Sequence, residues 1–317
     1  MRLSGGQSLA DGSTAATPLF SSLGEENVNE SRHLDYPASI GSKDPMLFLP
    51  VSFCERVCYN PCIWIKSGTG GEMVFCMIYV MSDIHGNLRR FESVLAQIGL
   101  QPEDTLYILG DVIDRHPDGI RILRRIMATP NMHMLLGNHE YMMLRALGEP
   151  YDEADREAGL DPEACLALWY RNGGGVTHRY LKRISKAVRR ELFAYLKALP
   201  LNIDITVDGK AYKLVHGGPE EAFADNRDIR YPNATHFSVW KRWQPEDALP
   251  GGYTMIFGHT PTRYFQEAKP MTIYHGKARI GIDCGSGYPE TPDSELHGYG
   301  RLACLRLDDG REFYSEE

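Results

Sequence analysis

The sequence predicts an α/β fold in which helices cover both faces of a β-sheet. From residue 77 onward, short apolar runs alternate with amphipathic stretches, and this β-α-β-α-β order is typical of such sheets. Asn87 is positioned to cap the first helix, and Ile120, Leu123 and Ile126 mark the apolar face of the second. The predicted strands of this part cover residues 77–81, 105–109 and 132–136.

The second half of the chain predicts a helical insert followed by more strands. Residues 141–198 are mainly helical in pattern. Asp-Gly pairs at 208–209 and 309–310 predict hairpin turns. The later strands are predicted at residues 202–207, 212–216, 254–258, 278–283, 301–307 and 311–314.

Residues 1–76 differ in character from the rest. The first 43 residues are rich in Ser, Gly, Asn and Glu without sustained periodicity, a composition typical of disordered segments. Because a complete domain can start at Met77, we expect residues 77–317 to fold on their own. Residues 1–76 are then a disordered or non-native extension.

Composition excludes several classes of protein. A net charge of −8 and a pI near 5.8 argue against a nucleic-acid-binding surface. The longest apolar stretch, residues 46–65, is interrupted by Glu55, Arg56 and two prolines, so it does not predict a membrane span. It also lies too far from the first residue for a signal peptide. We therefore expect a soluble, cytoplasmic protein with no membrane partner.

The cysteines do not predict a disulfide framework or a metal cluster. Only three of the seven follow residue 76, and three cannot all pair with one another. Cys54, Cys58 and Cys62 form a C-x3-C-x3-C run, which lacks the shorter spacings of zinc and iron–sulfur motifs and has no accompanying His.

Five polar clusters each follow a predicted strand: SDIHGN (82–87), GDVIDR (110–115), GNHE (137–140), VHGG (215–218) and FGHTP (257–261). Any one of them could be a cap, a turn or a core histidine. Five in succession indicate a shared ligand-binding site, because the carboxyl ends of strands meet at one edge of an open sheet. Oxygen and nitrogen donors without thiolate suit manganese, iron or zinc. The candidate ligands are Asp83, His85, Asp111, Asn138, His139, His216 and His259.

The ordered motifs D-x-H, G-D-x-x-D-R, G-N-H-E, H-G-G and G-H-T resemble those of the calcineurin-like metallophosphoesterases. Within that superfamily they are similar to the PPP-type serine/threonine protein phosphatases of the bacterial and phage lambda-like branch. The segment WYRNGGGVT (169–177) and the closing strands support this branch. The resemblance covers residues 77–317, which it makes the catalytic domain. It implies a sandwich of two mixed β-sheets flanked by helices.

The resemblance also implies roles for single residues. His139 would be the general acid and Asp114 would orient it, while Arg115 and, from the VWKRW segment, Arg242 would bind phosphate. Asp83, His85 and Asp111 would hold a first metal, and Asp111 would bridge to a second metal bound by Asn138, His216 and His259.

These roles agree with what phosphoester hydrolysis requires. Two metals sharing a carboxylate about 3.5–4 Å apart supply a bridging hydroxide for in-line attack. Arginine recognises phosphate oxygens in a bidentate manner. A His paired with a carboxylate is kept protonated and aimed, as a general acid must be.

Two features depart from the family pattern or add to it. Many relatives carry Arg directly before G-N-H-E, where this chain has Leu136, so substrate affinity or class is in question. Residues 148–165 are strongly acidic, and we expect them to form a solvated helical lid that could disfavour acidic peptides.

The leading functional hypothesis is a phosphomonoesterase that uses two divalent ions, with manganese expected and iron or zinc as alternatives. Its substrate would be a phosphorylated protein or a small phosphoester. A symmetrical diadenosine tetraphosphatase is the enzyme alternative, because its fold and ligands would be nearly the same. A catalytically silent metal-binding scaffold would be expected to lack the general acid or the bridging ligand, and both are present here. The physiological substrate and the oligomeric state stay open.

Overall fold

The computed structural model describes residues 63–67, 70–74, 76–157, 159, 161–226, 228–244, 247–249, 251–288 and 300–316. In the N-terminal part, β1 (Ile63–Ser67) and β2 (Gly70–Val74) pair antiparallel in a hairpin that was not predicted from the sequence. Our expectation for residues 1–62 lies outside the described residues. None of the described helices is long and apolar enough to cross a membrane.

The first five-stranded sheet has the order β12-β11-β3-β4-β5. Its parallel strands are β3 (Ile78–Met81), β4 (Thr105–Ile108) and β5 (Met132–Met134), joined by α1 (Leu88–Ile98) and α2 (Gly119–Ala128). The antiparallel strands are β11 (Ala303–Arg306) and β12 (Glu312–Tyr314). The predicted helix cap is confirmed, since the Asn87 side chain accepts a hydrogen bond from the Arg90 N–H at 3.1 Å.

The second sheet has the order β6-β7-β8-β10-β9 and is also mixed. Asp208 and Gly209 both adopt positive φ angles (48° and 75°) at the turn between β6 and β7, as a tight hairpin requires. Its strands are β6 (Asn202–Val207), β7 (Lys210–Val215), β8 (Thr254–Phe257), β9 (Tyr274–Gly276) and β10 (Arg279–Gly281). Strand β9 was not predicted, because Tyr-His-Gly shows no alternation of apolar and polar residues.

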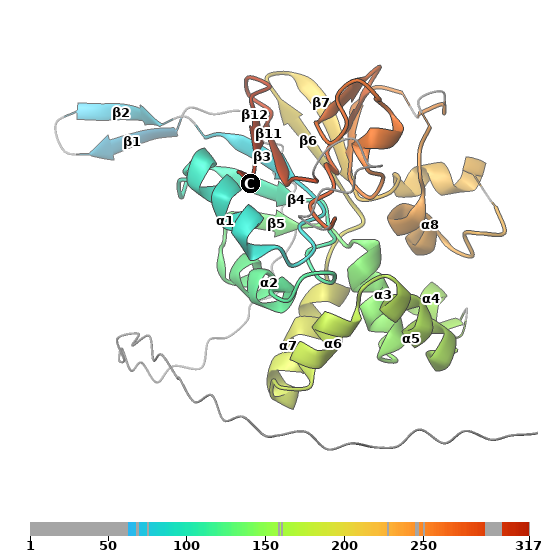
Figure 1. Cartoon of the computed structure of the whole chain (residues 1–317). Helices are drawn as coiled ribbons and strands as arrows, with labels where there is room; N and C mark the ends of the chain where they lie inside the picture. Colours follow the sequence, from blue (N-terminus) through green and yellow to red (C-terminus); the bar gives the residue numbers. More distant parts are fainter. Residues whose placement is uncertain are drawn as a thin grey trace, which may run out of the picture. The chain divides into compact units, whose positions relative to one another are not determined.

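The two sheets pack face to face and helices cover their outer faces (Figure 1). Between the sheets lie Val80, Leu109, Leu214, Ile256 and Leu305. Helices α1 and α2 pack on the outer face of the first sheet. On the second sheet the cover is formed by α8 (Ala234–Trp240) and the 3-10 helix η1 (Glu220–Asn226). The predicted α/β sandwich of two mixed sheets is thus confirmed.

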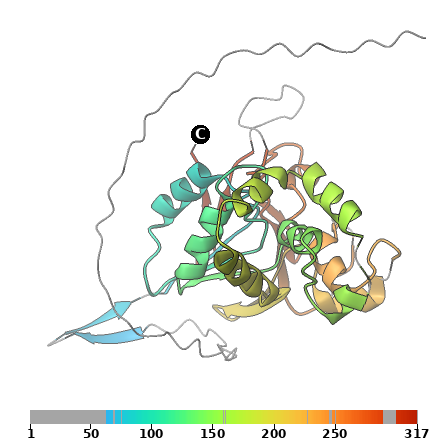
Figure 2. The same ribbon diagram turned by 90° about the horizontal axis from the view of Figure 1, so that it is seen from below.

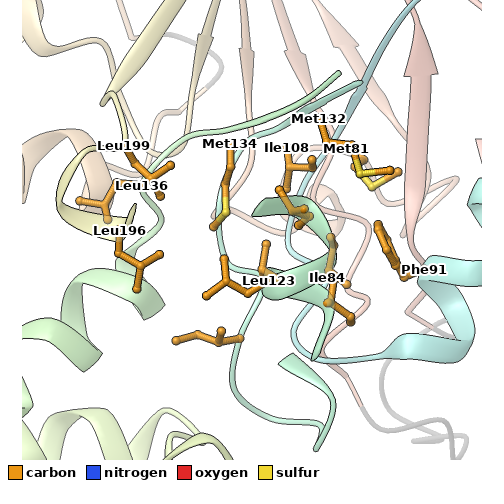
Figure 3. Packing of buried hydrophobic residues seen from close by; sticks show 14 of the residues in the cluster. Met81, Ile84, Phe91, Ile108, Leu123, Met132, Met134, Leu136, Leu196 and Leu199 are labelled. Carbon is orange, nitrogen blue, oxygen red and sulfur yellow. The ribbon is translucent and has the colours of Figure 1, made fainter. Parts of the chain in front are cut away.

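The helical insert gathers on one side of the strands (Figures 1 and 2). It starts with α3 directly after β5, and α3 packs against α5. Leu136, Leu196 and Leu199 fix the insert to the core, where their side chains lie together (Figure 3). The helices are α3 (Asn138–Ala146), α4 (Glu153–Glu157), α5 (Pro162–Arg171), α6 (Gly175–Leu181) and α7 (Lys186–Lys197).

Candidate metal centre

The candidate ligands come from loops that follow strands of both sheets. Asp83 and His85 follow β3, and Asp111 follows β4. On the second sheet His216 directly follows β7, and His259 comes two residues after β8. Asn138 is the first residue of α3, beyond β5. The structure therefore brings together side chains that the sequence separates by up to 176 residues.

Several of these loops have an unusual backbone conformation. Asp83, His85, Asp111 and His259 have φ angles of 56°, 52°, 54° and 61°. L-residues rarely adopt this left-handed region, although Asp and His do so more often than most. Hydrogen bonds between the loops hold it, because the N–H of Asp83 donates to Gly110 O (3.1 Å) and the N–H of His85 donates to Asp111 O (2.9 Å).

Asp111 lies between two groups of imidazoles. Its Oδ2 is 3.8 Å from Nε2 of His85 and 3.8 Å from Nε2 of His139. Its Oδ1 is 3.4 Å from Nε2 of His216, and His259 completes this second group. All these side chains are buried. One carboxylate thus faces two compact sets of nitrogen donors.

Two of the candidate donor atoms face each other without a proton to share, as expected for atoms that ligate a cation. The Nδ1 atom of His216 is 2.7 Å from the carbonyl oxygen of Leu109, and a carbonyl only accepts, so Nδ1 carries the proton. In the neutral ring Nε2 then holds a lone pair, yet it lies 2.9 Å from Oδ1 of Asn138, which is also an acceptor. A metal ion ligated by both atoms would satisfy this contact.

The electrostatics of the site also favour metal ligation. Burial lowers the pKa of His85 and of His259 well below the usual value, and nearby arginines lower both further. The neutral imidazole is the form that binds metals. Burial raises the pKa of Asp83, and the Asp111 carboxylate raises it again. A cation bound beside these two carboxylates would offset their repulsion.

Asp83 lies at the edge of this arrangement. Its Oδ1 is 3.8 Å from Nε2 of His85. Its Oδ2 accepts hydrogen bonds from the Ser82 hydroxyl (2.5 Å) and the His259 N–H (3.0 Å). The structure brings Asp83 next to His85 but leaves it outside the two compact groups around Asp111.

His139 and Asp114 form a buried pair beside the groups. Nδ1 of His139 is 2.8 Å from Oδ2 of Asp114, and both side chains are at most 1% exposed. Burial lowers the pKa of His139, but the carboxylates of Asp111 and Asp114 outweigh it, and the pKa is raised overall. Nε2, which points away from Asp114, is left to face Asp111 and Arg115.

The two arginines differ in their surroundings. Nη2 of Arg115 is 3.4 Å from Nε2 of His139, so its guanidinium reaches the general-acid candidate. Arg242 is exposed and donates from Nη1 to the carbonyl oxygen of His259 at 3.0 Å. Leu136, which stands where many relatives carry Arg, is fully buried and belongs to the apolar core cluster of the first sheet.

Glu140 has no role predicted from the sequence, although it belongs to the GNHE motif. The Glu140 carboxylate accepts hydrogen bonds from the backbone N–H groups of Asp111 (2.9 Å), Val112 (2.9 Å) and Ile113 (3.2 Å). Burial and the neighbouring Asp111 raise the pKa of Glu140 to about 8, against the effect of these donors. Glu140 therefore fixes the loop that carries Asp111. Its place in the GNHE motif is the feature of the sequence that could have identified it.

The loop after β10 is a second feature that sequence reasoning missed. Asp283 is buried, and burial together with the Asp83 carboxylate raises its pKa well above the usual value. A Cβ atom at Gly287 would lie 2.5 Å from Cδ2 of His85 and 2.7 Å from Nη1 of Arg115, so this loop lies against the site. Asp283 follows a strand like the other clusters, and that position could have identified it.

The comparisons with known proteins agree with this geometry. Residues 77–282 match the model of the calcineurin-like phosphoesterases. Serine/threonine-protein phosphatase 2 of Salmonella typhimurium is 28% identical over 200 residues, which are 59% of this chain and 81% of that protein. The symmetrical bis(5'-nucleosyl)-tetraphosphatase of Proteus mirabilis is 24% identical over 279 residues, covering 74% of this chain and 96% of that protein.

Similar solved structures include that of a metallophosphoesterase from Sphaerobacter thermophilus. It has a TM-score of 0.42 and 18% sequence identity, and the similarity covers 76% of this chain and 87% of that chain. The family model covers well over half of the chain and spans every predicted ligand. The chain belongs to the calcineurin-like phosphoesterase family.

Proposed function

We propose that this phosphoesterase is a two-metal phosphomonoesterase acting on phosphoserine and phosphothreonine in proteins. The observation that carries the proposal is the position of Asp111, whose two oxygens face separate imidazole groups beside the His139–Asp114 pair. The similarity to serine/threonine-protein phosphatase 2, over 81% of that protein, supports the choice of substrate. The segment WYRNGGGVT at residues 169–177 also supports this choice of substrate.

Enzymes of this family use two divalent metal ions, and the donor set described above fits them. We assign manganese first and iron or zinc as alternatives, because the donors are oxygen and nitrogen without thiolate. When bound, such ions supply an activated water and neutralise charge on the phosphoryl oxygens. The proposed ligands are Asp83, His85 and Asp111 for one ion, and Asp111, Asn138, His216 and His259 for the other.

The side chains around the metals have separate tasks in this proposal. Arg115 binds phosphoryl oxygens with its guanidinium, and Arg242 is a second candidate for this task. His139 donates the proton on Nε2 to the leaving oxygen. Asp114 accepts the hydrogen bond from Nδ1–H, which fixes the ring and favours its protonated form. Arg115 and the proton on Nε2 thus act on neighbouring atoms of one phosphate ester.

The proposal is tested with a phosphoserine peptide and added Mn²⁺. We expect Asp111→Asn to abolish turnover, and His139→Asn to lower kcat by about 10²- to 10⁴-fold. His133→Asn is the matched control, because His133 is an exposed residue of β5 away from the site. Turnover of His139→Asn at the wild-type rate would refute the general-acid role.

A symmetrical dinucleoside tetraphosphatase is the second candidate. The similarity to the Proteus mirabilis enzyme favours it, because that similarity extends over 96% of the relative. Incubation with diadenosine tetraphosphate separates the two candidates. Release of ADP together with inactivity toward phosphopeptides would replace the first proposal by the second.

A further inference from the structure

The helical insert reaches the proton-donating pair through Trp169. This side chain of α5 is fully buried, and its Nε1–H donates to Oδ2 of Asp114 at 2.8 Å. The same oxygen accepts the hydrogen bond from Nδ1 of His139, also at 2.8 Å. Oδ1 of Asp114 is buried and has no partner among the described residues. The orientation of the carboxylate therefore depends on two donors at one oxygen.

The rest of the same segment holds the backbone of the residues that it contacts. Asp114 and Arg115 are consecutive residues with φ angles of 72° and 65°. The N–H of Asp114 donates to the Thr177 hydroxyl (3.1 Å), and the N–H of Arg115 donates to the Gly173 carbonyl (3.2 Å). Two non-glycine residues in this conformation cost roughly 1–3 kcal/mol each. The segment at 169–177 supplies contacts that offset this cost.

Gly174 permits the close approach of the indole. A Cβ atom at this position would lie 2.3 Å from Nε1 and 2.4 Å from Cδ1 of Trp169. No side chain fits there without moving the ring. The Trp and the second glycine of the W-x-x-N-G-G pattern are thus coupled by packing, and the packing aims the N–H at Asp114.

We propose that Trp169 is a positioning residue for the general acid, because its indole N–H fixes the Asp114 carboxylate that aims His139. The inference rests on the proposed function of His139. Without the indole N–H, the buried carboxylate keeps one donor and gains freedom to rotate, since a buried acceptor with too few partners seeks others. His139 then turns with it, and Nε2 no longer points at the leaving oxygen.

The test compares two substrates on the variant Trp169→Phe. A phosphoserine peptide releases an alkoxide that needs a proton, whereas p-nitrophenyl phosphate releases a phenolate that does not. We expect kcat for the peptide to fall by about 10- to 100-fold, a part of what a general acid contributes, with KM unchanged. For p-nitrophenyl phosphate we expect kcat close to the wild-type value. Equal losses on both substrates, or no loss, would overturn the proposal.

Trp243→Phe is the matched control. Trp243 is also buried, at 1% exposure, but its Nε1 has no hydrogen-bond partner among the described residues. Trp169→Phe and Trp243→Phe remove the same side-chain volume, so a loss of kcat caused only by poorer packing would appear in both variants. In the double variant with His139→Asn, the substitution of Trp169 should lower kcat for the peptide no further, because it acts through His139.

A spectroscopic measurement decides the inference independently of activity. The Nδ1 proton of His139 should give a low-field NMR resonance that is absent in His139→Asn. In Trp169→Phe, or with the isostere 3-benzothienylalanine at position 169 if the Phe variant does not fold, the resonance should shift upfield or vanish. An unchanged resonance would contradict the proposal. Wild-type protein inactive on both substrates would refute the proposed function, and the resonance would still report on Trp169.

Discussion

At the scale of single residues, backbone strain is concentrated in the proposed site. The described residues include nine non-glycine positions with positive φ, and six of them belong to the proposed site. Each costs roughly 1–3 kcal/mol and persists only where surrounding contacts impose it. The hydrogen bonds between neighbouring loops are those contacts, so the backbone of the candidate ligands is held by the fold itself. The six residues are Asp83, His85, Asp111, Asp114, Arg115 and His259.

Leu136, directly before the GNHE motif, packs in the hydrophobic core. Its side chain is fully buried among apolar residues that include Leu196 and Leu199. We expect Leu136→Arg to lower the free energy of unfolding by at least about 3 kcal/mol, because a charge would be buried without a partner. Urea unfolding monitored by circular dichroism measures this. A folded variant with a lower KM for phosphopeptide would instead place position 136 at the substrate.

His236 in α8 predicts a dependence of stability on pH. Burial and the nearby Arg145 lower its pKa from 6.5 to about 4, and its ring stacks on Trp240 with centroids 5.9 Å apart. In the unfolded chain His236 becomes protonated below about pH 6.5, whereas in the folded chain it becomes protonated only near pH 4. The stability linked to His236 is therefore complete above pH 6.5 and is lost as the pH falls toward 4.

We expect this loss to reach about 1–2 kcal/mol at pH 5. Comparison with His236→Gln between pH 7 and pH 5 isolates it, because the carboxylates titrate alike in both proteins. The variant should lose less stability than the wild type over this range. Equal losses would show that His236 titrates normally in the fold.

At the scale of elements, the turn from β5 into α3 sets the distance between Asp111 and His139. A Cβ atom at Gly137 would lie 2.3 Å from the backbone N and 2.4 Å from Oδ1 of Asp111. We expect Gly137→Ala to push the two loops apart and to lower kcat by at least about 100-fold, as misplacement by about 1 Å does. Gly251→Ala is the matched control, since a Cβ atom there meets nothing within 4 Å. Similar kinetics in both variants would contradict this view of the turn.

The sequence predicted elements best where local pattern and tertiary context agree. Strand β6 matches its predicted range, and the cap at Asn87 is present, because both depend on neighbouring residues. Strand β5 ends at Met134, two residues early, because the N–H of Leu136 donates to Pro200 O outside the sheet. Motif order alone gave the candidate ligands. The contact between Trp169 and Asp114 spans 55 residues, and no local pattern reveals such a contact.

At the scale of the whole molecule, the apolar clusters formed by residues of described burial lie within residues 77–314. The two largest clusters join the first sheet to its helices and to the second sheet. The family match begins at residue 77 as well. At that residue the chain is anchored, because the N–H of Met77 donates to Oδ1 of Asp104 at 2.9 Å and its carbonyl accepts from Thr105. We therefore propose that residues 77–317 are an independent catalytic domain.

A chain that starts at Met77 tests this proposal. Its terminal amino group can still donate to Asp104, so the first strand keeps its anchor. We expect a melting temperature within about 2 °C of the full chain, which corresponds to less than about 1 kcal/mol, and an unchanged kcat on phosphopeptide. A start at Tyr79 is the matched control, since it removes the anchor at Met77 and the first residue of β3 and should not fold. Loss of activity in the chain starting at Met77, with its fold intact, would instead assign residues 1–76 a part in substrate binding.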